Sequence, residues 1–220
     1  MVFSDRKQAG QLLSKKLSDY SNRKDVVVLA IPRGGVVVGY EIARELKVAL
    51  NVVVTKKIGA PGNEELAIGA VAEDGEPIFD EQLVGQLQVD EDYRSAATAR
   101  VHRKIVDYIQ KFRGGRALDV AGKVVIVTDD GVATGSTMEA ALSWLREKKT
   151  AEIVLAVPIG ARDSTTRLEK FADRSVVLDK PFWFGAVGQF YREFGQVDDN
   201  EVKKILLESR RKSLPNGPLR

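Results

Sequence analysis

Continuously apolar, β-branched runs are the sequence feature that most limits the fold of this 220-residue chain. The first run, VVVLAI at 26–31, offers no polar side chain to water, which is typical of a strand buried on both faces of a parallel sheet. Further strands are predicted at 51–54, 123–128, 152–157 and 174–178. Helical patterns separate them. Strands that alternate with helices predict an α/β fold, with a mostly parallel, twisted sheet flanked by helices on both faces.

The helices are predicted where apolar residues repeat at helical spacing or where a long polar segment ends in glycines. These segments are 4–20, 36–47, 90–113, 136–148, 163–172 and a final helix that begins near 198. Residues 66–79 predict a hairpin that turns at Asp74-Gly75, because Asp-Gly supplies the positive φ of tight turns. The segment KKIGAPGNEE at 56–65 is predicted to be a glycine-rich loop.

Composition excludes several classes of protein. The chain is 44% hydrophobic and 30% charged, which is ordinary for a folded soluble protein. It has no cysteine, so disulfides and thiolate metal sites are excluded, and a single histidine argues against a transition-metal site. No apolar run reaches the ~20 residues that span a bilayer, and the first residues lack the apolar core of a secretory signal. We therefore expect a cytoplasmic protein without a membrane segment.

The net charge of +3 is concentrated at the carboxyl end of the sequence. Residues 203–220 hold six cations against one anion, so the other residues sum to −2. The six are Lys203, Lys204, Arg210, Arg211, Lys212 and Arg220. Such a cluster could touch nucleic acid, but we favour a solvated helix end. Nucleic acid is not an expected partner.

The segment VVIVTDDGVATGST at 124–137 carries the most specific chemistry in the sequence. Two carboxylates, Asp129 and Asp130, follow a buried strand, and glycines and hydroxyl residues come next. Glycines let backbone N–H groups approach an anion, and the helix that follows presents the positive end of its dipole. This predicts a phosphate cradle that differs from the GxxxxGK[ST] loop of nucleoside triphosphatases. The carboxylates would repel phosphate, so they should face a neutral group with hydroxyl donors, such as a sugar.

This pattern resembles the signature of the type I phosphoribosyltransferases, in which two acidic residues separate an apolar strand from a glycine/threonine loop. The resemblance covers about residues 25–160. It implies that Asp129 and Asp130 hold the ribose 2- and 3-hydroxyls of phosphoribosyl pyrophosphate (PRPP). It also implies that the 5′-phosphate binds to a loop made of Gly131, Val132, Ala133, Thr134, Gly135, Ser136 and Thr137. The alternative is a strand-to-helix turn with one aspartate as a helix cap, which leaves the second acid unexplained.

Two further loops are expected at the same end of the sheet, because ligands of such sheets bind beyond the carboxyl ends of the strands. The first is IPRGG at 31–35, where the resemblance implies that backbone amides of Gly34 and Gly35, with Arg33, bind pyrophosphate. The second follows the strand at 51–54. There the resemblance makes Lys56 or Lys57 the cation that neutralises the departing pyrophosphate, and Arg33 and these lysines are the predicted catalytic residues.

The resemblance also implies the organisation of the rest of the chain. We expect one domain over 1–220, with a core at about 25–160 and a lid insertion at about 60–115. A small hood at about 179–197, together with the C-terminal helix, is expected to hold the base. The base-binding candidates are Pro158, Trp183 and Phe184. Most aromatic residues of the hood are equally compatible with a packed core.

The implied reaction moves the 5-phosphoribosyl group of PRPP to a nitrogenous base and releases pyrophosphate, as in nucleotide salvage. Mg²⁺ is the expected cofactor, held mainly by the substrate and reached from Asp129 and Asp130 through water. Hypoxanthine–guanine transferases carry a third acid three residues after the second aspartate, where this sequence has Ala133. This departure puts a 6-oxopurine acceptor in doubt and leaves the base open.

Two other interpretations remain at this stage. The same fold could serve a PRPP- or nucleotide-sensing regulatory protein, although a sensor has no need of a lid that excludes water. A different nucleotide- or sugar-phosphate-binding α/β enzyme would have to explain the adjacent acids in another way. A homodimer is possible, with the helix at 90–113 as a candidate interface.

Overall fold

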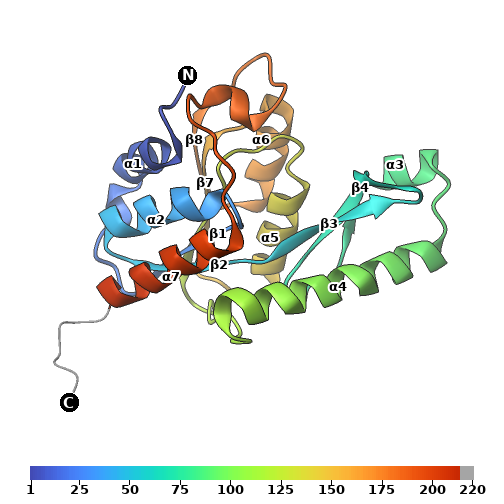
Figure 1. Ribbon diagram of the computed structural model, residues 1–220, viewed down its shortest axis with the longest axis horizontal. Coiled ribbons are helices and arrows are strands. Elements are labelled where there is room, and N and C mark those ends of the chain that lie inside the picture. The colour runs from blue at the N-terminus through green and yellow to red at the C-terminus, as the bar shows by residue number, and fades with distance from the viewer. Residues whose placement is uncertain (214–220) are drawn as a thin grey trace.

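A five-stranded parallel sheet forms the centre of the molecule (Figure 1). The computed structural model describes residues 1–213, with side chains up to Arg211. The strands follow the order β2 (Ala49–Val52), β1 (Val26–Ala30), β6 (Val124–Thr128), β7 (Glu152–Ile159) and β8 (Arg174–Asp179). All neighbouring pairs are parallel, and Thr128 of β6 lies level with Ala30 of β1. The predicted α/β fold is therefore confirmed, and the carboxyl ends of β1 and β6 meet at one edge.

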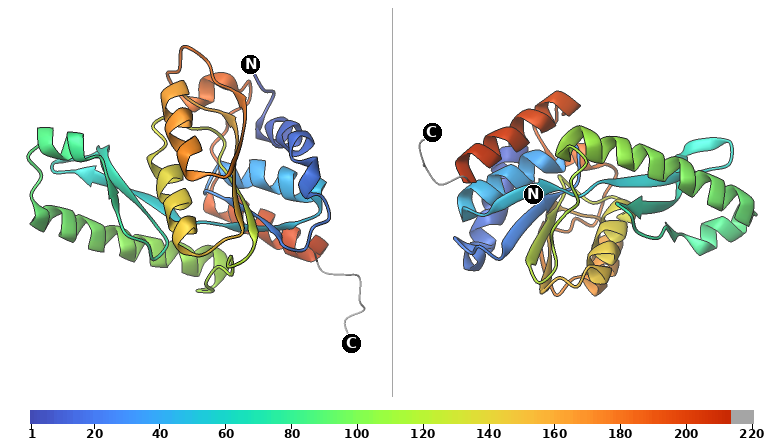
Figure 2. Two further views of the ribbon diagram at one scale, coloured as in Figure 1. Left: turned by 180° about the vertical axis from the view of Figure 1, so that it is seen from behind. Right: turned by 90° about the horizontal axis from the view of Figure 1, so that it is seen from below.

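Helices cover both faces of this sheet because its central strands are apolar on both sides. On one face, Val28 and Ile126 pack with helices α1 (Arg6–Lys16), α2 (Gly35–Leu46) and α7 (Asp199–Ser213). On the other face, Val125 and Val127 pack against α5 (Ser136–Glu147), and Leu168 of α6 (Arg162–Leu168) joins them. Figure 2 shows the two layers from further directions. Apolar residues on both faces are what the continuous runs in the sequence predict.

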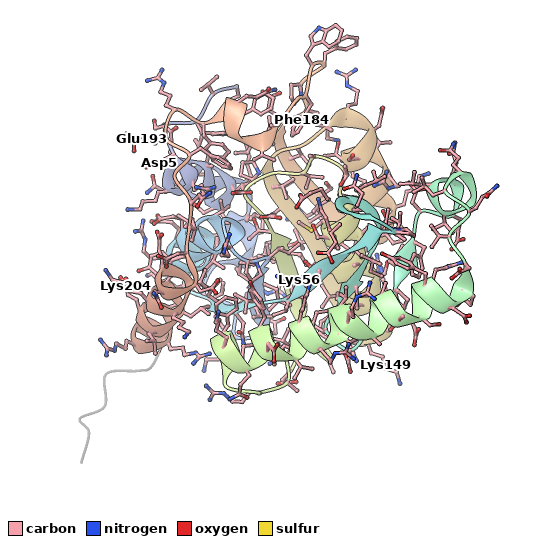
Figure 3. The ribbon with its side chains drawn as sticks, turned by 45° about the vertical axis from the view of Figure 1, so that its right-hand side comes forward. Asp5, Lys56, Lys149, Phe184, Glu193 and Lys204 are labelled. Carbon is pink, nitrogen blue, oxygen red and sulfur yellow. The ribbon has the colours of Figure 1, made fainter. Side chains whose placement is uncertain are left out.

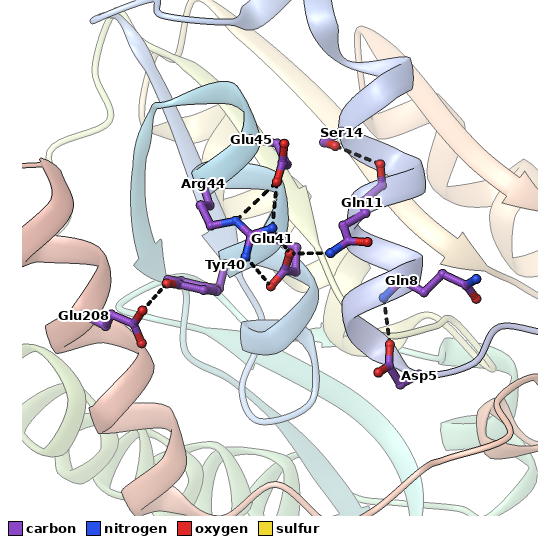
Figure 4. A network of polar contacts seen from close by, with 9 residues as sticks. All are labelled: Asp5, Gln8, Gln11, Ser14, Tyr40, Glu41, Arg44, Glu45 and Glu208. Carbon is purple, nitrogen blue, oxygen red and sulfur yellow. Dashed lines mark hydrogen bonds and ion pairs between the residues drawn. The ribbon is translucent and has the colours of Figure 1, made fainter.

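Polar contacts fix α2 between α1 and α7 (Figure 4). The buried carboxylate of Glu41 accepts a hydrogen bond from Gln11 of α1 at 3.1 Å and pairs with Arg44 at 2.7 Å. On the other side, the hydroxyl of Tyr40 donates to Glu208 of α7 at 2.6 Å. These contacts hold the helical layer that positions the first residues of α1 and α7 at the carboxyl edge of the sheet.

An arm projects from this body and is built on a second sheet. Its antiparallel strands are β3 (Thr55–Ala60), β4 (Asn63–Ala72) and β5 (Ile78–Phe79), and its helices are α3 (Glu81–Gln86) and α4 (Glu91–Arg113). Figure 1 shows α4 lying along the strands over the length of the arm. Ile58 and Ile68 pack against Val101 and Ile105 of α4. The predicted helix at 90–113 is confirmed, and so is the hairpin at 66–79, although the positive φ of its turn lies at Glu73 (50°) and not at Asp74-Gly75.

The prediction of a glycine-rich loop at 56–65 is wrong. Most of that segment is paired strand, with Lys56 opposite Val71 and Lys57 opposite Ala70. Only Pro61-Gly62 forms the turn, where Gly62 has a φ of 73°. The glycines suggested a loop, but Gly59 is needed within the strand because it leaves room for the facing strand. A Cβ at this position would lie 2.6 Å from the Cα of Glu64. The short helix α3 was also not foreseen.

A buried ion pair lies at the root of the arm, where the arm joins the parallel sheet. Arg113 is 2% exposed, and its Nη2 donates to the Oε2 of Glu73, which is 5% exposed, at 2.5 Å. The other oxygen of Glu73 accepts the backbone N–H of Val54 at 2.7 Å. The pair therefore joins the end of α4 and the end of β4 to the point where the chain leaves the parallel sheet for the arm.

The segment after β8 folds over the carboxyl edge of the parallel sheet. It includes the 3-10 helix η3 (Val187–Phe190), and two similar turns, η1 (Ser18–Tyr20) and η2 (Glu169–Phe171), occur elsewhere. Phe190 and Tyr191 are buried with Phe3 from the start of the chain and with Ile159 from β7. This apolar cluster fixes the hood against the end of β7.

Candidate active site

The acidic pair and the glycines of the IPRGG loop are in direct contact. A Cβ on Gly34 would lie 1.9 Å from the Oδ2 of Asp130, and a Cβ on Gly35 would lie 2.8 Å from the Cα of Asp129. Only glycine leaves room for the carboxylates at these two positions. The peptide bond between Pro32 and Arg33 in the same loop is cis. Two loops that are almost a hundred residues apart in sequence thus form one surface.

The two carboxylates have different electrostatic surroundings. Asp130 pairs with Arg6 of α1, with 2.7 Å between its Oδ2 and the arginine Nε. Asp129 accepts the backbone N–H of Asp130 at 2.8 Å but has no ion pair of its own among the described residues. Burial raises the pKa of Asp129 well above its usual range, and the nearby charge of Asp130 raises it further. The fold therefore disfavours the ionised form of Asp129, and a ligand that donates hydrogen bonds to this carboxylate would stabilise that form.

Arg6 and its contacts with the hood were not foreseen as parts of this site. The guanidinium of Arg6 lies over the ring of Phe194, 3.8 Å from its centroid, and donates to the carbonyl of Gly195 at 2.8 Å. The hydroxyl of Tyr191 donates to the carbonyl of Asp130 at 2.5 Å, and burial raises its pKa. Nothing in the sequence marks Arg6, because its partners lie more than 120 residues away.

The loop after the acidic pair is tightly anchored on its inner side. Val132 donates its backbone N–H to the carbonyl of Ile159 and accepts from the N–H of Ala161, so the loop continues the parallel pairing of β6 with β7 beyond the ends of the strands. Gly135 has a φ of 81°, a conformation that favours glycine, and directly precedes α5. Thr134, Ser136 and Thr137 follow on the accessible side, where Thr134 is exposed. The predicted cradle therefore sits at a helix N-terminus with hydroxyl groups around it.

Two side chains from α6 support the outer side of this loop and were missed by the sequence. The hydroxyl of Ser164 donates to the carbonyl of Ala133 at 2.6 Å. Arg167 donates to the carbonyl of Thr134 at 2.6 Å and pairs with Glu139 of α5 at 2.9 Å. The arginine is about half exposed, so an anion in the cradle would meet its charge.

The two predicted lysines point to opposite faces of β3, as neighbours on a strand must. Lys57 is exposed and lines a cleft of about 820 Å³. The cleft lies between the arm and the loop at 131–137, here called the phosphate-type loop, and Thr134, Ser136 and Arg167 also line it. Lys56 is on the α4 side, where Figure 3 labels it, with its Nζ 3.7 Å from the ring centroid of Tyr108. The lysines therefore serve different parts of the site.

Arg33 faces the same region as Lys56. Its guanidinium lies 3.8 Å from Asp199, the first residue of α7, and Lys111 of α4 also pairs with that carboxylate. The hydrogen bond from Lys111 holds the pKa of Asp199 below its usual value, and the charges of Arg33 and Lys56 act in the same direction. Three cations from three segments thus gather beside the IPRGG loop.

The base-binding candidates are dispersed. Pro158 is buried within β7. Phe184, which is labelled in Figure 3, packs on Phe190 with their ring centroids 5.1 Å apart. Trp183 is 82% exposed and contacts Phe182 edge to face. None of these three candidates lines the cleft beside the phosphate-type loop. A different aromatic ring, that of Phe194, is connected to the acidic pair by way of Arg6.

Fold and site together define a class. The model of the phosphoribosyl transferase domain family matches residues 5–194, and the chain therefore belongs to that family. It is 41% identical over 210 residues to two Mycobacterium tuberculosis proteins, "Putative phosphoribosyl transferase MT0597" and "Putative phosphoribosyl transferase Rv0571c". The match covers 93% of this chain and 46% of each relative, so the chain spans about half of their length.

A solved structure shares both fold and sequence. The crystal structure of TT1426 from Thermus thermophilus superposes with a TM-score of 0.79 at 41% identity, over 94% of this chain and 99% of that one. The similarity extends over the arm and the hood as well as the parallel sheet, because it covers nearly the whole length of both chains.

Potential metal ligands are scattered over the described part of the chain. Within those residues, no three His, Cys, Asp or Glu side chains are grouped so that they could hold a metal ion. Across residues 1–213, no helix is long and apolar enough to cross a bilayer. Of the cations at the carboxyl end, the Lys212 side chain and Arg220 lie outside the described residues.

Proposed function

We propose that this chain transfers the 5-phosphoribosyl group of PRPP to a nitrogenous base and releases pyrophosphate. The observation that carries the proposal is the packing of Asp129 and Asp130 against Gly34 and Gly35. This contact puts the two carboxylates, which we propose bind the sugar, next to the loop that we propose binds pyrophosphate. Family membership and the phosphate-type loop at 131–137 support the same interpretation.

Each part of the substrate has residues that suit it. Asp129 and Asp130 would accept hydrogen bonds from the ribose 2- and 3-hydroxyls, and Arg6 would fix the orientation of Asp130. The loop 131–137, with Lys57 nearby, would hold the 5′-phosphate at the start of α5. Arg33 and Lys56 would face the pyrophosphate. A donor held at both ends presents its anomeric carbon to the base in a fixed orientation.

The chemistry then depends mainly on charge. The bond from the anomeric carbon to the pyrophosphate oxygen breaks as a nitrogen of the base forms its bond from the other face. The base loses a proton, and the pyrophosphate leaves with the bonding electrons. Arg33 and Lys56 would stabilise the charge that grows on the leaving group, while the acidic pair would favour the positive charge that develops on the sugar ring.

Mg²⁺ remains the proposed cofactor. The ion would arrive with the substrate phosphates, since Mg²⁺ is usually bound by one or two carboxylates together with substrate phosphates. Asp129 and Asp130 are the carboxylates that could reach such an ion through water. When bound, the ion would neutralise charge on the pyrophosphate.

Nucleotide salvage in the cytoplasm is the setting that we propose for this activity. We also propose a homodimer with α4 at its interface, and the molar mass measured by light scattering would test it. Turnover distinguishes an enzyme from the alternative, a PRPP-sensing regulator. A sensor would bind PRPP but would release no pyrophosphate when a base is added.

The test is calorimetric titration of PRPP with Mg²⁺ into the wild-type protein and into Asp129→Asn/Asp130→Asn. We expect micromolar binding that the double variant loses. The control is Asp92→Asn/Asp107→Asn, which makes the same charge change at exposed positions of α4 away from the acidic pair and should bind as the wild type does. Equal binding by the wild type and the acidic-pair variant would overturn the proposal. A screen of bases for pyrophosphate release would then identify the acceptor.

A further inference from the structure

A second hollow in the molecule is lined by cations and lies away from the candidate active site. This cavity, of about 340 Å³, includes the first residues of β1 and β2, whereas Asp129 and Asp130 follow the last residue of β6. Because these strands are parallel, the cavity opens toward the other end of the sheet. The loop that follows α4 and the last turns of α7 complete its wall. Its charged residues are Lys24, Arg113, Arg116, Asp119, Lys123 and Arg210.

These cations outnumber the carboxylates around them. Asp119 pairs with Lys123 at 2.7 Å and leaves the other cations of the cavity without its charge. Among the described residues, no carboxylate lies within ion-pair distance of Arg116 or Arg210. A solvated surface would usually place such residues apart, since like charges repel.

Arg113 adds an unsatisfied buried group to this excess. Its guanidinium is 2% exposed and uses Nη2 for the pair with Glu73. Its Nε and Nη1 have no hydrogen-bond partner within the described part of the chain. Buried polar groups are nearly always satisfied in folded proteins, and one that is not needs an explanation. A ligand that accepts hydrogen bonds would supply it.

The electrostatics of Arg210 agree with this interpretation. Burial lowers the pKa of its guanidinium, and the positive charge of Arg116 lowers it further. An anion bound between the two side chains would offset the repulsion that Arg116 exerts on Arg210. Apart from Asn51, the other lining residues are apolar and include Val27 and Leu118.

We propose that this cavity binds a small phosphate-bearing anion. Arginine suits the role because its planar fork of donors matches phosphate oxygens. The volume lies at the lower end of the ~300–1,000 Å³ of small-molecule sites, which is enough for a nucleotide. The apolar wall would take the nucleoside part, and inorganic phosphate alone would use only the arginines. The proposal does not depend on the transferase function.

An anion at this site would act on the arm through a short path. Arg113 pairs with Glu73, and Glu73 accepts the N–H of Val54. Val54 directly precedes β3, the strand that carries Lys56 and Lys57. An anion that engages Arg113 therefore contacts the same buried pair that fixes the root of the lysine-bearing strand.

The test uses ADP and inorganic phosphate as probes, in EDTA, with the full chain. Binding is measured by calorimetry for the wild type, for Arg210→Gln and for Arg116→Gln/Arg210→Gln. Arg210 has no carboxylate partner among the described residues, so its substitution should leave folding intact even where the double variant does not fold. The control is Arg103→Gln, an exposed arginine on α4.

We expect ADP to bind the wild type and Arg103→Gln equally, and Arg210→Gln at least tenfold more weakly. ADP should also raise the melting temperature of the wild type by several degrees and that of Arg210→Gln by much less. Binding of phosphate as tight as that of ADP would identify free phosphate as the ligand and support the site. Absence of binding at millimolar probe, or equal binding by Arg210→Gln and the wild type, would overturn the proposal.

Discussion

Two acidic centres in this molecule show how differently a fold can treat a carboxylate. At the root of the arm, Glu73 faces one arginine and one backbone N–H, and each of its oxygens has a partner. At the edge of the parallel sheet, Asp129 and Asp130 are adjacent, and within the described residues only Asp130 has an ion pair, with Arg6. Burial is the main cause that raises the pKa of both Glu73 and Asp129. The strongest neighbouring charge then lowers the pKa of Glu73, since it is Arg113, but raises that of Asp129, since it is Asp130.

The difference separates a structural role from a functional one. A paired, fully hydrogen-bonded carboxylate contributes to the fold mainly because removing its partner would leave a buried charge. Two neighbouring carboxylates with one cation are unfavourable in the folded state, and such strain is concentrated at binding sites. The arm thus uses its acid to hold a strand in place, whereas the sheet edge keeps its acids available for a ligand.

The largest effect is expected from Glu73→Ala. The substitution leaves Arg113 buried without its partner and the N–H of Val54 without an acceptor, so the free energy of unfolding should fall by about 3–5 kcal/mol. Urea denaturation measures it. Glu76→Ala, at an exposed position three residues later, should change stability by less than about 0.5 kcal/mol. Equal losses in the two variants would contradict a bracing role for Glu73.

A smaller loss is expected from Gly34→Ala at the acidic pair. The added Cβ would lie 1.9 Å from the Oδ2 of Asp130, so the carboxylate must move away from Arg6. We expect a cost of about 1–3 kcal/mol, as for other overpacked sites, and a loss of PRPP binding. Gly85→Ala serves as the matched control, because nothing lies within 4 Å of its added Cβ. Wild-type affinity in Gly34→Ala would show that the two loops do not act together.

Asp129→Asn should stabilise the folded protein, in contrast to the two preceding substitutions. The amide keeps an oxygen for the N–H of Asp130 but removes the ionised form that burial disfavours. We expect unfolding at neutral pH to cost about 1 kcal/mol more, although PRPP binding is lost. Thermal denaturation and calorimetry measure the two quantities. A destabilised variant would mean that Asp129 is favourably placed for folding and would remove the contrast with Glu73.

The smallest effect is a change in how stability depends on pH. The folded-state pKa of Asp129 is raised, so its contribution is fully present below the unfolded value of about 3.9 and is lost as pH rises through the folded value. Relative to Asp129→Asn, the wild type should therefore lose stability as pH rises above about 4. The slope has an upper limit of ~1.4 kcal/mol per pH unit, which is what one full proton gives. Parallel curves for the two proteins would contradict the raised pKa.

Local sequence patterns were enough to predict the strands of the parallel sheet, most helices and the phosphate-type loop at 131–137. The run 124–137 gives a buried strand, two acids and a hydroxyl-rich loop before a helix, and each of these is present at that place. The patterns succeed because apolar periodicity and glycine placement act over a few residues. They failed at 56–65, where glycines in a paired strand look like glycines in a loop.

The sequence by itself determined the type of fold, the acidic pair and the phosphate-type loop, since each depends on neighbouring residues. Only the tertiary structure decided which partners meet there. Arg6 reaches Asp130, Tyr191 reaches the carbonyl of that residue, and Arg113 reaches Glu73 across distances of 40 to 124 residues along the chain. Packing of the strands and helices sets these contacts, and no short pattern encodes which side chains a folded sheet brings together.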